Sequence, residues 1–307
     1  RRESTEEDHV GLVGLLNSSV SCFWIKQRFQ TKGSSGMGRG IYDERWEFFY
    51  QISGTGLAAF PLPEQKPLDL ARTLDALGQK YTALQPSAVC LLDTPNAKRV
   101  SDSRIQAIAI RGQLIALQEE LDWQCYQLYG LLTDDLRYPG DDLPVLAFGE
   151  RAFEIVMARQ MAKGELQTAW FERHSSTPIT DFPKHWPSAY RKLVERRIKL
   201  IETNKEIGLI ERPEYKRRWN TEPWEEQERR ALKNWLLDRL EDKRYWPRIE
   251  LQSTAHLGDR ASADAEFMQV AALYRGRADF DLAALVAELV EGESVPFLPI
   301  LRYKASG

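Results

Sequence analysis

Four cations surround a glycine-rich segment near the start of the chain. The segment, residues 33–40, reads Gly-Ser-Ser-Gly-Met-Gly-Arg-Gly, and it is flanked or interrupted by Lys26, Arg28, Lys32 and Arg39. Glycine permits nearly any backbone angle, and Lys and Arg side chains contact DNA phosphates and guanine edges. We therefore predict these four residues as DNA-binding candidates. The alternative interpretation is ordinary solvated surface charge.

The same segment does not have the pattern of a nucleotide-binding loop. Gly33 and Gly38 match the outer glycines of a P-loop, but Arg39 and Gly40 stand where Lys and then Ser or Thr would be required. The dinucleotide-binding pattern also fails, because the segment follows a predicted helix and not a strand. We predict a flexible loop or a DNA-contacting loop.

A second candidate is the basic triplet Lys216-Arg217-Arg218, which stands beside Trp219 with no acid between its cations. Uninterrupted cations next to an aromatic ring are suited to a nucleic-acid backbone. The other cations between residues 191 and 233 are interleaved with glutamates, which is typical of solvated helix faces with pairs three or four residues apart. We therefore predict that the triplet contacts phosphates.

The residues that carry hydrolytic or metal chemistry do not form a recognised pattern. The four histidines lack the HExxH spacing, and no serine lies in a Gly-x-Ser-x-Gly turn. The three cysteines lie far apart, which favours a reducing cytoplasm over a disulfide framework or a zinc site. We predict no catalytic residue and no metal ligand in this chain. The histidines are His9, His174, His185 and His256, and the cysteines are Cys22, Cys90 and Cys125.

Composition indicates a folded, water-soluble protein. Of 307 residues, 43% are hydrophobic and 28% are charged, and the formal net charge is −3. Because that charge gives no overall attraction to DNA, any contact must come from a local patch. The chain has no apolar run long enough for a membrane span, and its first residues are too acidic for a signal peptide. We expect a cytoplasmic protein without membrane contact, and the missing initial methionine suggests a fragment.

Hydrophobic periodicity predicts a mainly α fold with a small α/β portion at the amino terminus. Alternating residues at 46–53 predict a strand, and proline-rich breaks fall near residues 60–67 and 139–144. These breaks suggest three domains, at 1–63, 64–135 and 136–307, the second being a helical spacer or hairpin. Helices are predicted at 10–29, 68–81, 105–131, 152–162, 189–206, 224–239 and 280–289. The tryptophans recur at helical or strand spacing, so we interpret them as core residues.

Several blocks, in this order along the chain, resemble one protein family. They are residues 12–19 (LVGLLNSS), 22–27 (CFWIKQ), 60–63 (FPLP), 120–131 (ELDWQCYQLYGL), 207–219 (IGLIERPEYKRRW) and 296–304 (PFLPILRYK). The chain is similar, over nearly its whole length, to the carboxy-terminal region of PglX-type adenine-specific methyltransferases of BREX phage-defence systems. The resemblance implies that residues 1–63 end a target-recognition domain and that helical regions follow.

The resemblance also implies a reaction in the parent protein, which is transfer of a methyl group from S-adenosylmethionine to the exocyclic nitrogen of adenine in duplex DNA. The family's Asn-Pro-Pro-Tyr motif, which grips the flipped adenine, is absent from this chain. The nearest sequence, residues 93–96 (Asp-Thr-Pro-Asn), has the wrong order. No catalytic or cofactor-binding residue is therefore carried over, and S-adenosylmethionine would bind outside this chain.

Two functions follow as hypotheses. In the first, the chain is the DNA-recognition and scaffold portion of a site-specific adenine-N6 methyltransferase, with duplex DNA as its partner. In the second, it is a protein-interaction scaffold that docks other phage-defence components without touching DNA. Salt dependence of DNA binding separates them, because contacts to phosphates weaken steeply as salt rises.

Overall fold

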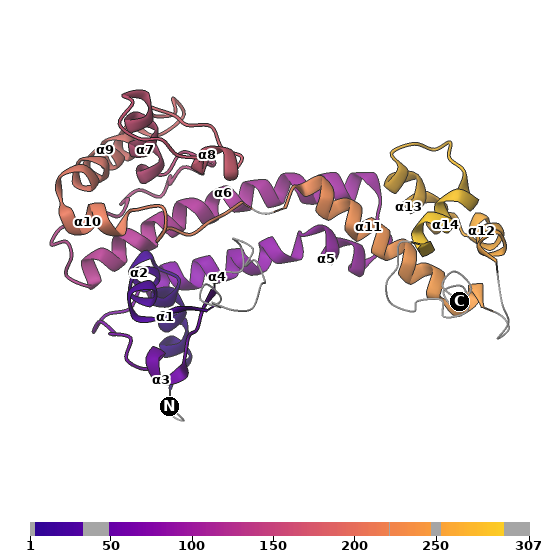
Figure 1. The fold of residues 1–307 in the computed structure, drawn as a ribbon, viewed down its shortest axis with the longest axis horizontal. Coiled ribbons are helices and arrows are strands. Elements are labelled where there is room, and N and C mark those ends of the chain that lie inside the picture. Colours follow the sequence, from indigo (N-terminus) through magenta and orange to yellow (C-terminus); the bar gives the residue numbers. More distant parts are fainter. Residues whose placement is uncertain (1–3, 33–48, 221, 247–252, 292–307) are drawn as a thin grey trace, which may run out of the picture. The chain divides into compact units, whose positions relative to one another are not determined.

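The computed structural model describes residues 4–32, 49–220, 222–246 and 253–291 (Figure 1). It is mainly α-helical, as predicted from the sequence. The chain forms two compact units, each built from two stretches of sequence. The domain ranges expected from the sequence, 1–63, 64–135 and 136–307, stay a prediction. Unit 1 comprises Arg1–Gly78 and Arg111–Asn220, and unit 2 comprises Gln79–Ile110 and Thr221–Gly307.

Unit 1 begins with two helices, α1 (Glu6–Leu16) and α2 (Ser19–Arg28), where the sequence predicted one. The single-helix prediction was wrong because Ser18 starts a new helix, its hydroxyl accepting a hydrogen bond from the amide of Ser21 at 3.3 Å. A carboxylate from elsewhere in the unit reinforces the break. Asp122 accepts the backbone N–H of Ser19 at 2.8 Å and its hydroxyl proton at 2.7 Å.

The α/β portion expected at the amino terminus is small in the described residues. β1 (Thr31–Lys32) pairs antiparallel with β2 (Phe49–Tyr50), with Thr31 opposite Tyr50, and α3 (Gly54–Leu57) follows. The start of the predicted strand, residues 46–48, and the glycine-rich segment lie outside the described residues. A single two-residue ladder is therefore the only sheet in the described part of the chain.

Two helices contribute residues to both units, α4 (Leu68–Ala83) and α6 (Ala97–Leu128). α6 was predicted from residue 105 with one continuous apolar side. Leu114 and Leu121 are buried as expected, but Ile105 and Ile108 are 65% and 49% exposed. The prediction of one buried side was thus wrong for these two isoleucines, which lie in the part of α6 that belongs to unit 2.

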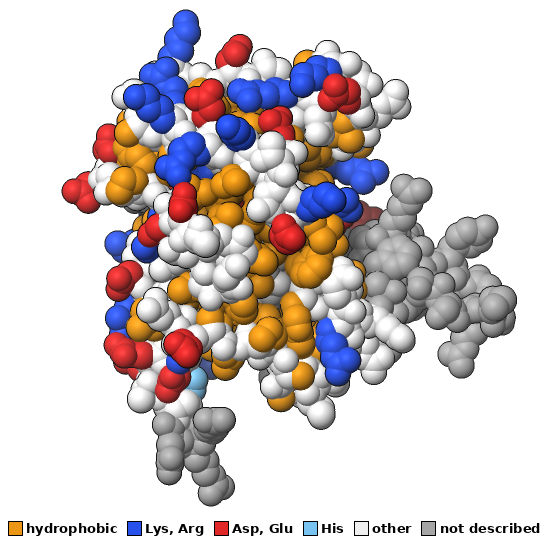
Figure 2. All heavy atoms as spheres, turned by 90° about the vertical axis from the view of Figure 1, so that its left-hand side faces the viewer, with side chains coloured by type: hydrophobic (Ala, Val, Ile, Leu, Met, Phe, Trp, Pro, Cys, Tyr) orange, Lys and Arg blue, Asp and Glu red, His pale blue; other side chains and the backbone are white. Residues whose placement is uncertain are grey.

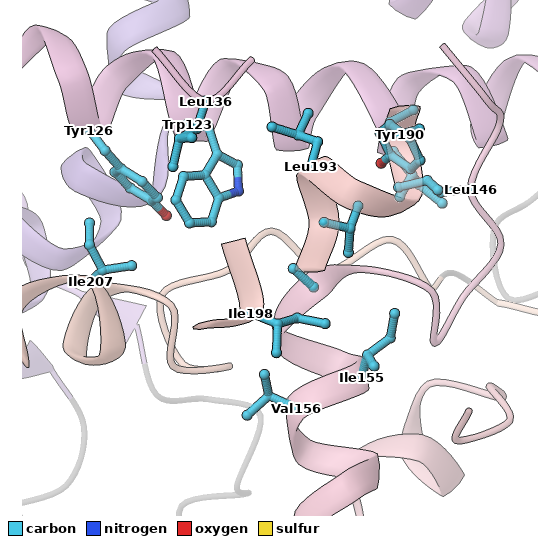
Figure 3. Close-up of a cluster of buried hydrophobic side chains, with 14 of the residues drawn as sticks. Trp123, Tyr126, Leu136, Leu146, Ile155, Val156, Tyr190, Leu193, Ile198 and Ile207 are labelled. Atoms are coloured by element: carbon cyan, nitrogen blue, oxygen red, sulfur yellow. The ribbon is translucent and has the colours of Figure 1, made fainter. Parts of the chain in front are cut away.

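The core of unit 1 is built on the second half of α6 (Figure 3). Trp123 and Tyr126 of α6 meet Ile155 of α7 (Ala152–Ala162) and Ile198 of α9 (Ser188–Thr203), all of them buried. Trp186 is also buried, so the interpretation of tryptophans as core residues is confirmed for it and for Trp123. The remaining helices of this unit are α7 (Ala152–Ala162), α8 (Trp170–Arg173), α9 (Ser188–Thr203) and α10 (Lys205–Ile210).

The predicted helix 189–206 is divided in the structure at Asn204, which separates α9 from α10. The Asn204 side chain accepts a hydrogen bond from the amide of Ile207 at 3.0 Å, so it caps α10. The chain changes direction at this cap, and Ile207 and Ile210 of α10 are buried in the core. The polar segment that follows, residues 211–220, is thereby placed against the core of unit 1.

Unit 2 has its own hydrophobic core, in which Leu236, Leu257, Phe267 and Leu285 are fully buried. Asp264 caps α13 (Ala265–Arg275) and also accepts a hydrogen bond from the Arg239 guanidinium at 2.8 Å, which joins α13 to α11 (Trp224–Glu241). The helices predicted at 224–239 and 280–289 lie in this unit, but its other short helices were not predicted. Its elements are α5 (Pro86–Leu92), α11 (Trp224–Glu241), the 3₁₀ turn η1 (Lys243–Tyr245), α12 (Thr254–Ser262), α13 (Ala265–Arg275) and α14 (Leu282–Glu291).

Among the described helices, none combines the length and the apolar character needed to cross a lipid bilayer.

The burial pattern of unit 2 predicts unequal effects of two leucine substitutions. Leu236→Ala should lower the free energy of unfolding by about 2–5 kcal/mol, because it leaves a cavity in a close-packed core. Leu91→Ala should change it by less than about 0.5 kcal/mol, because Leu91 is 80% exposed. Urea unfolding followed by circular dichroism measures both. Equal losses in the two variants would contradict this assignment of the core.

Candidate nucleic-acid interface

The basic triplet predicted to contact phosphates is split between the interior and the surface of unit 1. Lys216 is buried, with a side chain that is 0% exposed. Arg217 and Arg218 are exposed. The phosphate contact predicted for Lys216 is incompatible with this burial, so that prediction was wrong. The phosphate contacts of Arg217 and Arg218 stay predictions.

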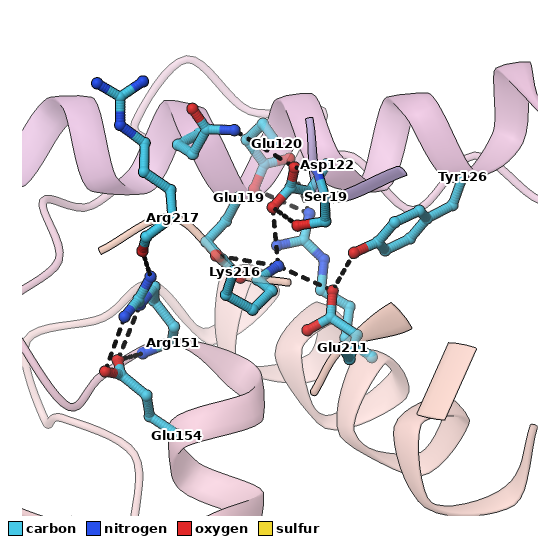
Figure 4. Close-up of polar contacts among 12 residues, drawn as sticks. Ser19, Glu119, Glu120, Asp122, Tyr126, Arg151, Glu154, Glu211, Lys216 and Arg217 are labelled. Carbon is cyan, nitrogen blue, oxygen red and sulfur yellow. Dashed lines mark hydrogen bonds and ion pairs between the residues drawn. The ribbon is translucent and has the colours of Figure 1, made fainter. Parts of the chain in front are cut away.

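The Lys216 ammonium lies among three carboxylates in the interior (Figure 4). Its Nζ is 2.8 Å from Asp122 Oδ2, 2.9 Å from Glu211 Oε1 and 3.4 Å from Glu119 Oε1. Tyr126 donates a hydrogen bond to the same Glu211 oxygen. Burial disfavours the charged form of Lys216, but the three carboxylates more than offset that effect, so the pKa of Lys216 is raised.

Glu119 is the least satisfied member of this cluster. Its carboxylate makes no hydrogen bond in the described part of the chain, and its nearest cation is Lys216. Burial raises the pKa of Glu119 to about 7, although the positive charge of Lys216 lowers it. Three carboxylates around one ammonium leave excess negative charge, so a proton on Glu119 relieves the repulsion near neutral pH.

A second buried ion pair, between Arg151 and Glu154, holds the backbone of the same segment (Figure 4). Arg151 donates to both Glu154 oxygens, at 3.0 and 2.9 Å, and its Nη1 donates to the carbonyl oxygen of Arg217 at 2.7 Å. The Trp170 indole donates to Glu154 at 3.0 Å. The segment is therefore fixed at two adjacent positions, through the side chain of Lys216 and the carbonyl of Arg217.

The end of α2 lies against this segment, which brings Lys26 to a residue 188 positions away in the sequence. Lys26 donates a hydrogen bond to the carbonyl of Glu214 and lies 5.8 Å from the centre of the Tyr215 ring. Lys26 and Arg218 both act electrostatically on the Cys22 thiol, whose pKa is raised by burial and lowered by these two cations. Lys26 is thus held at Glu214, three and four positions before Arg217 and Arg218.

The remaining predicted residues differ in how far the structure describes them. Arg28 is exposed in the last turn of α2, two positions beyond Lys26. Lys32 lies in β1, where the backbone is described but the side chain is not. Arg39 lies outside the described residues. We call Lys26, Arg28, Arg217 and Arg218 the basic surface.

The cations of α9 behave as the sequence suggested for most of them. Figure 2 shows Lys and Arg side chains interspersed with Asp and Glu over the upper part of the face, where α9 lies. Arg197 is an exception, because it is buried and donates to both oxygens of Glu120 at 2.8 Å. Intermixed charges of this kind favour a solvated face, whereas Arg217 and Arg218 adjoin without an acid between them.

Comparison with known proteins assigns the chain to a family. A family model described as "Domain of unknown function (DUF7008)" matches residues 114–307. The chain belongs to the DUF7008 family. The match includes Glu119, Asp122, Glu211 and Lys216, but not Lys26 or the Ser19 end of α2. The buried carboxylate cluster of this DUF7008 chain therefore lies within the family region.

The DUF7008 chain is also 46% identical, over 318 aligned residues, to a protein of Streptomyces coelicolor named adenine-specific methyltransferase PglX. The match covers the whole chain but only 26% of that relative's length. No solved structure matches the chain. The resemblance to PglX-type methyltransferases expected from the sequence is confirmed, and the chain is related to one part of such a protein.

Sequence reasoning missed the burial of Lys216, although a signal for it exists in the DUF7008 region. Residues 118–122 read Gln-Glu-Glu-Leu-Asp in the middle of a helix whose neighbouring positions are apolar. Acids in the buried part of a helix require compensating cations. Glu119, Glu120 and Asp122 could thus have indicated that a lysine and an arginine elsewhere in the chain are internal.

The raised pKa of Glu119 predicts a pH dependence of stability. The folded protein keeps the proton up to about pH 7, whereas an ordinary glutamate loses it near 4.5. The folded state therefore binds more protons between these values, and the free energy of unfolding should fall as pH rises through them. Glu119→Gln should weaken this dependence and unfold at higher urea than the wild type at pH 8. Parallel pH profiles of the two proteins would contradict the prediction.

Removing the central cation should be far more damaging than removing a surface cation. Lys216→Met should lower the free energy of unfolding by about 3–5 kcal/mol, because the buried carboxylates would then have no compensating charge. Arg218→Met, which removes an exposed cation two positions away, is the matched control and should cost less than about 1 kcal/mol. Thermal and urea unfolding measure both. A Lys216→Met variant as stable as the control would show that the cluster is not held by this lysine.

Proposed function

We propose that this chain is the DNA-recognition and scaffold portion of a site-specific adenine-N6 DNA methyltransferase of bacterial phage defence. The parent enzyme depends on S-adenosylmethionine, and its catalytic domain lies outside this chain, which alone has no methyltransferase activity. The name of the Streptomyces coelicolor relative supports the class of enzyme. Its partners are duplex DNA and other proteins of a BREX-type defence system, in the cytoplasm and away from membranes.

The single observation that carries the DNA-binding proposal is the basic surface. Lys26 of α2 donates a hydrogen bond to the carbonyl of Glu214, and Arg217 and Arg218 are exposed three and four positions further along the same segment. Cations grouped in this way bind phosphates and release counterions. A local group of this kind is what a chain with a net charge of −3 needs in order to bind DNA.

Residues near the amino terminus complete the proposed contact. Arg28 lies beyond Lys26 on α2, and Lys32 and Arg39 follow it in the sequence. In this proposal Arg217 and Arg218 position the chain on the duplex. The amino-terminal cations then supply base-edge contacts, which are the contacts that distinguish one sequence from another.

A groove in the described part of unit 1 does not fit S-adenosylmethionine. It has a volume of about 790 Å³ and is lined in part by Leu117, Tyr138 and Leu193. The cofactor's ribose hydroxyls and sulfonium group call for available acceptor groups, but the carboxylates at this groove already bind arginines. Asp135 pairs with Arg137, and Glu120 pairs with Arg197. No methyl-transfer step is derived from this chain.

One observation favours the scaffold alternative, in which the chain docks other defence components without DNA. On α5 of unit 2, Leu91 and Leu92 are 80% and 73% exposed. Adjacent exposed leucines on one short helix suit a protein contact. This alternative and the DNA-binding proposal predict different responses to salt. Moderate salt has little effect on a contact that buries leucines, but it weakens contacts with phosphates.

Fluorescence anisotropy with a labelled mixed-sequence duplex, at low and moderate salt, tests the proposal. We expect binding that weakens as salt rises. The triple variant Lys26→Ala, Arg28→Ala and Arg218→Ala should bind at least about tenfold more weakly than the wild type. Its salt slope should fall by about one for each phosphate that the variant no longer binds.

The matched control carries alanine at three exposed lysines of α9 and α10, which changes the net charge by the same amount. It should bind nearly as the wild type does. Equal weakening in the control and test variants would indicate nonspecific attraction, and absence of binding at low salt would favour the scaffold function. The control positions are Lys192, Lys199 and Lys205.

A further inference from the structure

Arg217 differs from its neighbour Arg218 in how firmly its backbone is held. Its carbonyl oxygen accepts a hydrogen bond from Arg151 Nη1 at 2.7 Å. Arg151 is itself buried and locked to Glu154 by two hydrogen bonds. The preceding residue is Lys216, whose ammonium is fixed among buried carboxylates. Two buried ion clusters therefore hold the chain on either side of the Arg217 Cα atom.

The Arg217 side chain also lies over an aromatic ring. Its guanidinium carbon lies 4.5 Å from the centre of the Trp219 ring, which is a cation–π contact. A guanidinium held over an aromatic ring keeps its N–H donors directed around its edge. The side chain then gives up less rotational freedom when those donors bind a ligand, so binding is favoured.

The Arg217 guanidinium has no carboxylate partner among the described residues. Its only hydrogen bond there is a long one, from Nη1 to Asn17 Oδ1 at 3.4 Å. Although the residue is exposed as a whole, its guanidinium lies against Trp219, and partial burial there lowers the pKa of Arg217. A guanidinium that is partly desolvated, oriented and without a carboxylate is poised to bind an anion or a planar pair of acceptors.

We propose that Arg217 is the bidentate anchor of the DNA contact, a preoriented guanidinium that binds two acceptor atoms in one plane. This inference rests on the proposed DNA-binding function and assigns it a principal residue. The acceptor pair is either two oxygens of a backbone phosphate or O6 and N7 of a guanine in the major groove. Lys216, Arg151 and Trp219 act as positioning residues because they fix Arg217 and do not touch the DNA.

Arg218 provides the contrast that makes the inference testable. It is exposed, and no hydrogen bond or ion pair holds it in the part of the chain that the structure describes. Its contribution is therefore that of a flexible point charge, which lysine reproduces. Lysine cannot reproduce a planar two-donor contact, so the Arg-to-Lys exchange separates the two roles.

The experiment compares Arg217→Lys, Arg217→Ala, Arg218→Lys and Arg218→Ala with the wild type in the 307-residue chain. Anisotropy at low salt measures binding to two duplexes, one rich in G·C pairs and one made only of A·T pairs. Arg217→Lys should bind about tenfold more weakly than the wild type, close to Arg217→Ala. Arg218→Lys should bind as the wild type does. Unfolding midpoints equal to the wild type's confirm that each variant is folded.

The outcomes separate this inference from the proposed function. Weaker binding by Arg217→Lys on both duplexes identifies phosphate as the acceptor, and weaker binding confined to the G·C-rich duplex identifies guanine. Binding by the wild type together with unchanged binding by Arg217→Lys overturns the inference alone. If the wild type binds neither duplex at low salt, the proposed function fails and the role of Arg217 fails with it.

Discussion

The arrangement of unit 1 depends on the ion pairs that the buried Lys216 ammonium makes with three carboxylates. The ammonium joins α6, through Asp122 and Glu119, to Glu211 at the end of α10. The same Asp122 carboxylate caps α2 at Ser19, so one lysine indirectly fixes a third element. Burying these charges costs solvation energy, and that cost is offset only when every partner is in place. An alternative packing that displaces one partner exposes the others to an uncompensated charge.

Other buried acids of α6 also need partners, and these partners come from several parts of the unit. Glu120 binds Arg197 of α9, and that arginine also donates to the carbonyl of Leu136 at 3.0 Å. The apolar side chains of α6, such as Trp123, pack against α7 and α9 but would tolerate small shifts along the helix. Ion pairs and their hydrogen bonds do not tolerate such shifts, so they set the register in which the apolar core packs.

Periodicity predicted the elements whose ends coincide with a change of pattern. The helix at 152–162 has the predicted ends, and Glu154 in its first turn helps to define its start. Periodicity did not place the break at Ser18, because apolar residues recur at helical spacing up to Leu16 and again from Val20. Asp122, which stabilises the break, lies more than 100 positions away. In the candidate site, too, some features could be predicted from the sequence and others could not. Arg217 and Arg218 could be picked out by their charge, but the burial of Lys216 depends on carboxylates distant in sequence.

The burial of Lys216 also changes what the net charge of −3 means for DNA binding. Among the described residues, the interior encloses five carboxylates but only three Lys or Arg side chains, those of Arg151, Arg197 and Lys216. The rest of the chain is therefore less negative than the formal charge suggests. A phosphate at the surface responds most strongly to the charges within about 10 Å of it, because salt screens more distant ones. The enclosed carboxylates hold Lys216 inside, while Arg217, one residue further on, keeps its charge available at the surface.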